Sequence, residues 1–273
     1  MKLIDIDSYF SAFLHAWLEE HQDKLLDIDQ VEVLMPSLYD AFLNAPAEWL
    51  NGALPNEYFD GLDGTRLVAL MRQYLDEAIP VPDLLLEKIT ESGCDAEESL
   101  YDLLTGSPAG DELRMLAIRL LDEMGSTRPL LLYISWQIQR EDRDELADSA
   151  LGSLDEMGET AVPPMLEALP EANEAGQEAM LTILSRYPQY PQVFDALIRL
   201  FDVCPERQAI LAACLGRLGD KRALPLLMQR ADEDDLKYLD YIELRAAIEA
   251  LGGEAPSRVF DEDPEYEALR GMM

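Results

Sequence analysis

A helical apolar run that ends on glycine or proline returns at a nearly constant interval through the second half of the chain. Successive closures lie 33, 30, 31 and 33 residues apart, and each is followed by a second apolar run. The closing pairs are Met124-Gly125, Met157-Gly158, Tyr187-Pro188, Leu218-Gly219 and Leu251-Gly252. A period of this length is typical of helix pairs that stack and bury their apolar faces against neighbouring pairs. The sequence therefore predicts an all-α fold, a right-handed α-solenoid of stacked antiparallel helix pairs.

Aligning the first helix of each repeat on its closing residue shows three recurrent positions. The position four before closure is aliphatic in all five copies: Leu121, Leu154, Leu184, Leu215 and Ile248. The position five before closure is small or apolar: Leu120, Ser153, Ile183, Cys214 and Ala247. The residue directly before closure is large: Met124, Met157, Tyr187, Leu218 and Leu251. We expect these positions to form the buried stripe of an amphipathic helix, with Cys214 as a core residue.

Helical spacing continues outside the repeats, and strand signals are almost absent. In the first half we expect helices at about 8–21 with Ser8 as N-cap, 29–44 with an interruption or a kink at Pro36, 65–79, 83–91 and 95–104. The second helices of the repeats are expected at about 127–140, 160–170, 190–203 and 221–232. The predicted organisation is a helical region at 1–110 (divergent repeats or a cap), a repeat array at 111–252, and an acidic tail or cap at 253–273.

The chain is strongly acidic, with 55 Asp and Glu against 21 Lys and Arg and a formal net charge of −34. Residues 1–172 hold 36 of the acidic and 10 of the basic residues. Such a surface repels nucleic acid and anionic lipid, since both bind through cationic side chains. It attracts a basic protein segment or serves solubility, and the two alternatives stay open. We expect any acidic docking face to lie in the first two-thirds of the chain.

Residues with catalytic or metal-binding potential are few and poorly spaced. Cys94, Cys204 and Cys214 form no Cys-x-x-Cys pair, which favours reduced thiols, and His15 and His21 do not share a helical face. Phosphate-binding and nucleophile motifs are missing, so we expect no catalysis, no cofactor and no metal. The first residues lack a signal peptide's apolar core, and the strongly apolar stretch at 129–136 is too short to span a bilayer. A cytoplasmic location is expected.

Two phrases in the last repeats resemble those of HEAT-repeat proteins, an armadillo-like α-solenoid family. Leu218-Gly219-Asp220-Lys221-Arg222-Ala223-Leu224-Pro225 is similar to the family's inter-helix turn. Residues 243–252 resemble its first helix, with Arg245 at the recurrent basic position. The resemblance covers about 111–252. It implies an adaptor or scaffold without catalysis whose second helices line a concave face. The family also includes lyases that attach or remove a tetrapyrrole on a client protein, which is the alternative.

Candidate contact residues lie on the second helices of the repeats. On 127–140, we expect Leu130, Leu131, Ile134 and Ile138 to face inward, and Leu132, Tyr133 and Trp136 to lie on the opposite side. That side is either buried under neighbouring repeats or presents aromatic anchors, which are enriched at binding hot spots. The partner-binding set proposed from the sequence is Tyr133, Trp136, Arg140, Glu167, Arg199 and Asp202.

Three hypotheses for function follow. In the first, the chain is a protein–protein adaptor that binds a partner protein or a basic segment. In the second, it is a lyase or chaperone acting on a chromophore-bearing client. In the third, an uncapped terminal repeat drives self-assembly, and the oligomeric state stays open.

Overall fold

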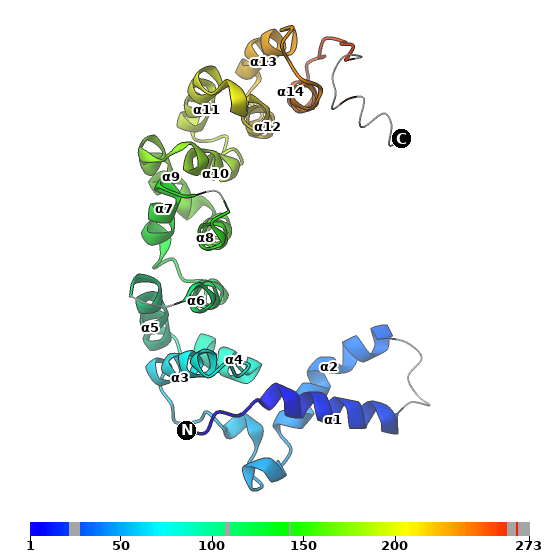
Figure 1. The fold of residues 1–273 in the computed structure, drawn as a ribbon, viewed down its shortest axis with the longest axis vertical. Helices are drawn as coiled ribbons and strands as arrows, with labels where there is room; N and C mark the ends of the chain where they lie inside the picture. The colour runs from blue at the N-terminus through cyan, green and yellow to red at the C-terminus, as the bar shows by residue number, and fades with distance from the viewer. Residues whose placement is uncertain (22–27, 107–109, 142, 261–265, 267–273) are drawn as a thin grey trace. The chain divides into compact units, whose positions relative to one another are not determined.

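The computed structural model describes residues 1–21, 28–106, 110–141, 143–260 and 266 (Figure 1). These residues form α-helices and short 3-10 helices, with no strand among them, which confirms the prediction of an all-α protein. No helix within the described ranges has both the length and the apolar character needed to cross a bilayer.

The chain divides into two compact units, residues 1–128 and 129–273, which are described separately. The α-helices of the first unit are α1 (Ile6–Glu20), α2 (Ile28–Leu43), α3 (Gly64–Asp76), α4 (Asp83–Glu91), α5 (Cys94–Thr105) and α6 (Asp111–Glu123). Those of the second unit are α7 (Leu130–Ile138), α8 (Glu145–Glu156), α9 (Val162–Ala168), α10 (Glu174–Leu184), α11 (Pro191–Val203), α12 (Gln208–Leu218), α13 (Leu224–Ala231) and α14 (Tyr238–Ala250).

Short 3-10 helices lie in the connections between the α-helices. They are η1 (Glu48–Leu50), η2 (Pro55–Glu57), η3 (Gly158–Ala161), η4 (Leu169–Glu171), η5 (Pro205–Arg207) and η6 (Lys221–Ala223). The second helices predicted at 160–170 and 221–232 are thus shorter α-helices that follow a 3-10 turn. The boundary between the two compact units falls between α6 and α7, because α6 packs on α5 and α4 of the first unit. The boundaries expected at 110/111 and 252/253 rest on internal similarity, and they stay predictions.

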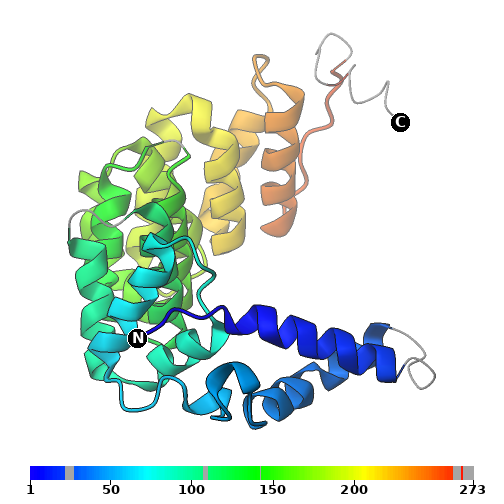
Figure 2. The ribbon, with the colours of Figure 1, turned by 60° about the horizontal axis from the view of Figure 1, so that its bottom comes forward.

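The helices of the second unit pack in two rows. Figure 1 shows α7, α9, α11 and α13 in one row beside α8, α10, α12 and α14 in the other. The second helix of one repeat contacts the first helix of the next, as α7 does α8 and α13 does α14, and the first helices α12 and α14 also pack against each other. The yellow α12 and the orange α14 stand side by side in Figure 2. Each helix therefore buries its apolar side against neighbours close in sequence.

Glycine ends the repeated helices because the chain there turns into the left-handed region. The φ angles are 65° at Gly125, 62° at Gly158, 76° at Gly219 and 81° at Gly252. At the first of these, the Gly125 N–H donates to the carbonyl oxygen of Asp122 at 2.8 Å and the Ser126 N–H to that of Leu121 at 2.9 Å. This is the Schellman pattern, which satisfies the last helical carbonyls and favours glycine. The predicted closures at these four glycines are confirmed.

The repeated core positions are also confirmed. At the position four before closure, all five residues are fully buried. At the position five before closure, the five residues, including Cys214, are fully or almost fully buried. The residue directly before closure is buried at Leu218 and Leu251 but only half-buried at Met124, Met157 and Tyr187. A stripe two residues wide therefore carries the core of every first helix, and the third position lies at its edge.

Helix α1 begins earlier than the sequence predicts. Its N-cap is Asp5, whose carboxylate accepts a hydrogen bond from the Ser8 N–H at 2.9 Å, so the expected cap at Ser8 is wrong. Asp5 competes successfully because aspartate and serine are comparably good caps and Ile6 is fully buried one residue later. The preceding segment is held by Tyr74, whose hydroxyl donates to the Ile4 carbonyl and accepts from the Ile4 N–H, both at 2.9 Å.

The described part of the tail docks on α14. The Tyr241 hydroxyl donates to the Pro256 carbonyl at 2.7 Å, and the Phe260 ring lies 5.1 Å from the Tyr241 ring and 5.3 Å from that of Tyr238. The Arg258 guanidinium donates to the Ala231 carbonyl at 3.1 Å. Of the two alternatives left open for the tail, residues 253–260 therefore adopt the one that covers the last helix.

Candidate functional site

The aromatic helix α7 is rotated relative to the sequence expectation. Tyr133 is fully buried, together with Ile134 and Gln137, while Leu131 is 70% exposed. The predicted inward position of Leu131 is therefore wrong, whereas that of Ile134 is confirmed. α7 has apolar residues on every side and its polar Gln137 is buried, so polarity does not mark its outer side, and one residue of error turns the assignment by about 100°. Burial under neighbouring helices, the other alternative, is what the structure has at Tyr133.

Arg140 is engaged within the protein. Its guanidinium donates to Gln137 Oε1 at 2.9 Å and forms an ion pair with Asp148 of α8, and its side chain is only 11% exposed. The Gln137 amide in turn donates to the Ala147 carbonyl at 2.8 Å. This polar group joins the end of α7 to α8, where Gln137 and Ala147 are buried and Asp148 is exposed. Arg140 therefore has a structural role that accounts for its position.

The other proposed contact residues lie at the surface. Trp136 is half-buried with its ring 5.6 Å from that of Tyr133, and Glu167 is exposed on α9. Arg199 and Asp202 are exposed on α11, as expected from the polar ridge of that helix. The inward side of α11 is buried as predicted and consists of Val193, Phe194, Leu197 and Phe201. The role of Trp136, Glu167, Arg199 and Asp202 in partner binding stays a prediction.

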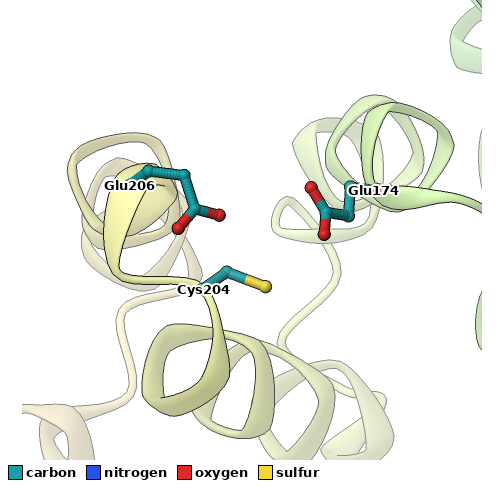
Figure 3. Close-up of side chains that lie close together, drawn as sticks. All are labelled: Glu174, Cys204 and Glu206. Atoms are coloured by element: carbon teal, nitrogen blue, oxygen red, sulfur yellow. The ribbon is translucent and has the colours of Figure 1, made fainter.

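A cysteine and two glutamates meet where α11 ends and α10 begins (Figure 3). One donor atom from each of Glu174, Cys204 and Glu206 lies within 4.8 Å of the others. Burial raises the pKa of the Cys204 thiol, and the charges of Glu174 and Glu206 raise it further. Metal coordination requires the thiolate. These surroundings favour the protonated thiol, so we assign no metal to this cluster.

A cavity in the first unit combines acidic and aromatic side chains. It has a volume of about 440 Å³ and is lined by residues of α1, α2, α4 and α6. We call it the Asp7 cavity and define it by Asp7 and Phe10 of α1, Tyr39 of α2, and Asp83 and Glu87 of α4. Met35, Pro36 and Leu86 supply further apolar lining. This composition suits a ligand with a cationic group and an apolar stem.

Asp7 is half-buried whereas Asp83 and Glu87 are exposed, and their carboxylates repel one another. Burial, followed by the nearby charge of Asp83, raises the pKa of Asp7 to about 6. Burial and the charges of Asp83 and Glu91 also raise the pKa of Glu87. One Asp7 oxygen accepts a hydrogen bond from the Asp83 N–H at 3.3 Å, which fixes the α1 carboxylate toward α4. The cavity therefore holds negative charge that a bound cation would stabilise.

Aromatic rings form the wall beside these carboxylates. The Phe10 and Tyr39 rings meet edge to face with their centroids 4.9 Å apart, and Phe42 lies 5.4 Å from Phe10. Burial is the main cause that raises the pKa of Tyr39, so its hydroxyl stays neutral. The rings pack against one another and keep the wall of the cavity in place.

Sequence reasoning missed the Asp7 cavity because its residues come from four separate segments. One signal was present: Asp83 and Glu87 are four residues apart on α4, so two like charges share a face of a helix whose Leu84, Leu85 and Ile89 are buried. Such a pair is unfavourable for the helix alone. Comparison with known proteins adds no assignment, since no family model, no curated protein and no solved structure matches this chain.

Proposed function

We propose that this protein is a non-catalytic adaptor of HEAT-like α-solenoid type that binds a basic segment of a partner protein. The observation that carries the proposal is the uncompensated charge of the first unit. Residues 1–128 contain 26 acidic and 8 basic residues, a net charge of −18. Six of those eight basic residues already lie within 4 Å of a carboxylate: Arg66, Arg72, Lys88, Arg114, Arg119 and Arg128.

Most acidic residues of this unit therefore have no lysine or arginine of the same unit left to neutralise them. Self-repulsion of this kind disfavours the folded state and raises the local concentration of cations. A basic protein segment relieves the repulsion and gains directional hydrogen bonds to carboxylates. Nucleic acid and anionic lipid do neither, because they carry the same sign of charge.

The two-row packing of the second unit supports the adaptor part of the proposal. Its first helices use their buried stripes for contact with neighbours, and α11 directs Asp195, Arg199 and Asp202 to solvent. Packing of this type leaves long helical surfaces available for protein contact. None of the sites found in the described residues favours the alternative of a tetrapyrrole lyase or chaperone. Visible absorbance of the purified protein tests that alternative.

The test uses a fluorescein-labelled peptide that contains several arginines and a matched peptide with citrulline at the same positions. Citrulline keeps the shape of arginine and removes its charge. Fluorescence anisotropy is measured at about 50 mM and about 300 mM salt, between which the Debye length falls from roughly 14 Å to 6 Å. We expect saturable binding of the arginine peptide alone, weakened at high salt. Equal binding of both peptides, or none, would contradict the proposal.

A further inference from the structure

We propose that the Asp7 cavity receives an arginine side chain of the basic segment, an inference that rests on the proposed function. Four carboxylates from three helices line it: Asp7 of α1, Asp83 and Glu87 of α4, and Glu123 of α6. Among the lining residues that the structure describes, the only lysine or arginine is Arg119, whose Nε lies 3.4 Å from the Glu123 carboxylate. The charge of the cavity is therefore left for an external cation.

Two features favour guanidinium over a metal ion. A calcium ion takes six to eight oxygen ligands, whereas much of this cavity is apolar, with Phe10, Tyr39 and Leu86 in its lining. Arginine has a planar group that donates to several carboxylate oxygens at once and stacks on aromatic rings. Its methylene stem buries favourably against the apolar wall. The volume of about 440 Å³ is sufficient for a whole side chain.

The Asp7 carboxylate and the helices that carry Asp7, Asp83 and Glu87 are held in place before binding. The Asp83 N–H donates to Asp7, and Asp7 follows directly on the buried Ile6 of the capped first turn of α1. Asp83 and Glu87 are one turn apart on α4, which is anchored by the buried Leu84 and Leu85. A site with fixed acceptors loses little conformational freedom when it binds a ligand. The same repulsion that costs stability in the free protein is relieved by the guanidinium.

The experiment compares two double variants that remove the same charge. Asp7→Asn with Glu87→Gln neutralises the cavity and keeps the size of both side chains. Glu57→Gln with Asp102→Asn neutralises two exposed acids of the same unit that do not line the cavity. The Kd of the arginine peptide is measured by anisotropy for both variants and the wild type, and each is followed in a urea titration.

We expect the cavity variant to bind about tenfold more weakly than the wild type, because charge-assisted hydrogen bonds are lost. The control variant should change the Kd by no more than about twofold, as expected for screened surface charge. The cavity variant should also resist urea at least as well as the wild type, so weaker binding cannot be attributed to unfolding. If both variants weaken binding equally, the cavity is not the site, although the basic segment still binds. If the wild type binds no arginine peptide, the proposed function fails and the cavity assignment with it.

Discussion

Replacing Gly176 by alanine tests the closest helix contact of the second unit. Gly176 lies in the first turn of α10, directly against the end of α7. A Cβ built at this position would overlap the backbone carbonyl oxygen of Gln137 and come within 3.0 Å of its carbonyl carbon. Neither atom belongs to a flexible side chain, so α7 and α10 must move apart. Such movement would strain the hydrogen bond from the Asn173 N–H to the Ile138 carbonyl, which is 2.8 Å long.

The expected magnitude is the balance of two effects. Alanine favours a helix over glycine by about 1 kcal/mol. Forcing an extra carbon into a packed contact costs about 1–3 kcal/mol, and the cost is near the upper end when backbone must shift. We therefore expect Gly176→Ala to lower the free energy of unfolding by about 2 kcal/mol. Gly152 on α8 is the matched control, because a Cβ there has no neighbour within 4 Å. Gly152→Ala should raise the free energy of unfolding by about 0.5–1 kcal/mol.

The assay is urea unfolding followed by tryptophan fluorescence. Trp17 and Trp49 lie in the first unit, so a background with both replaced by phenylalanine leaves Trp136 of α7 as the reporter next to the mutated contact. With a slope of about 2 kcal/mol per molar urea, Gly176→Ala should lower the midpoint by about 1 M. Opposite signs for the two alanines support the reasoning. An unchanged or higher midpoint for Gly176→Ala would refute the close packing of α7 on α10.

Three further predictions concern single side chains. Because the pKa of Asp7 is raised to about 6 in the folded protein, its charge disfavours folding above that pH. Asp7→Asn should therefore raise the urea midpoint at pH 7.5, and this gain should shrink as the pH falls through 6 toward 5. A gain that does not depend on pH would contradict this origin. Exposed Cys94 should react with Ellman's reagent at least about tenfold faster than buried Cys204 and Cys214, whose thiol pKa values are raised. Cys94→Ala should remove this fast phase. A fast phase that survives in Cys94→Ala would contradict the burial of the other two cysteines. Tyr133→Ala should lower the free energy of unfolding by about 3–5 kcal/mol, and Trp136→Ala by clearly less, because Trp136 is only half-buried. Thermal unfolding measures both losses. Equal losses would contradict the orientation of α7.

The repeat pattern predicted the core well because it depends on local chemistry that five copies share. An aliphatic residue four positions before closure in all five copies, and glycine at a left-handed helix end in four of them, are visible in sequence; both are confirmed at Gly125 with Leu121 and at Gly219 with Leu215. Which side of a helix faces solvent was harder to predict where polar and apolar residues do not separate onto opposite sides. On α11, charged residues mark the outer side and the prediction holds, whereas α7 has hydrophobic residues all round and Leu131, expected to face inward, is exposed.

The Asp7 cavity shows a different limit. Its chemistry depends on the approach of α1 to α4, whose acidic residues lie more than 70 positions apart in the chain. No spacing rule within one helix relates Asp7 to Asp83. What the sequence did indicate was an excess of acid in this part of the chain, and that excess is the property on which the proposed function depends.

Hydrogen–deuterium exchange with and without the arginine peptide tests the central claim most directly, because it locates binding without any mutation. We predict that the peptide slows exchange in α1 and α4, at Ile6–Glu20 and Asp83–Glu91, whose acidic residues line the Asp7 cavity. The citrulline peptide should leave these segments unchanged. Protection confined to α7 and α11, at Leu130–Ile138 and Pro191–Val203, would contradict the claim and place the binding surface on the second unit.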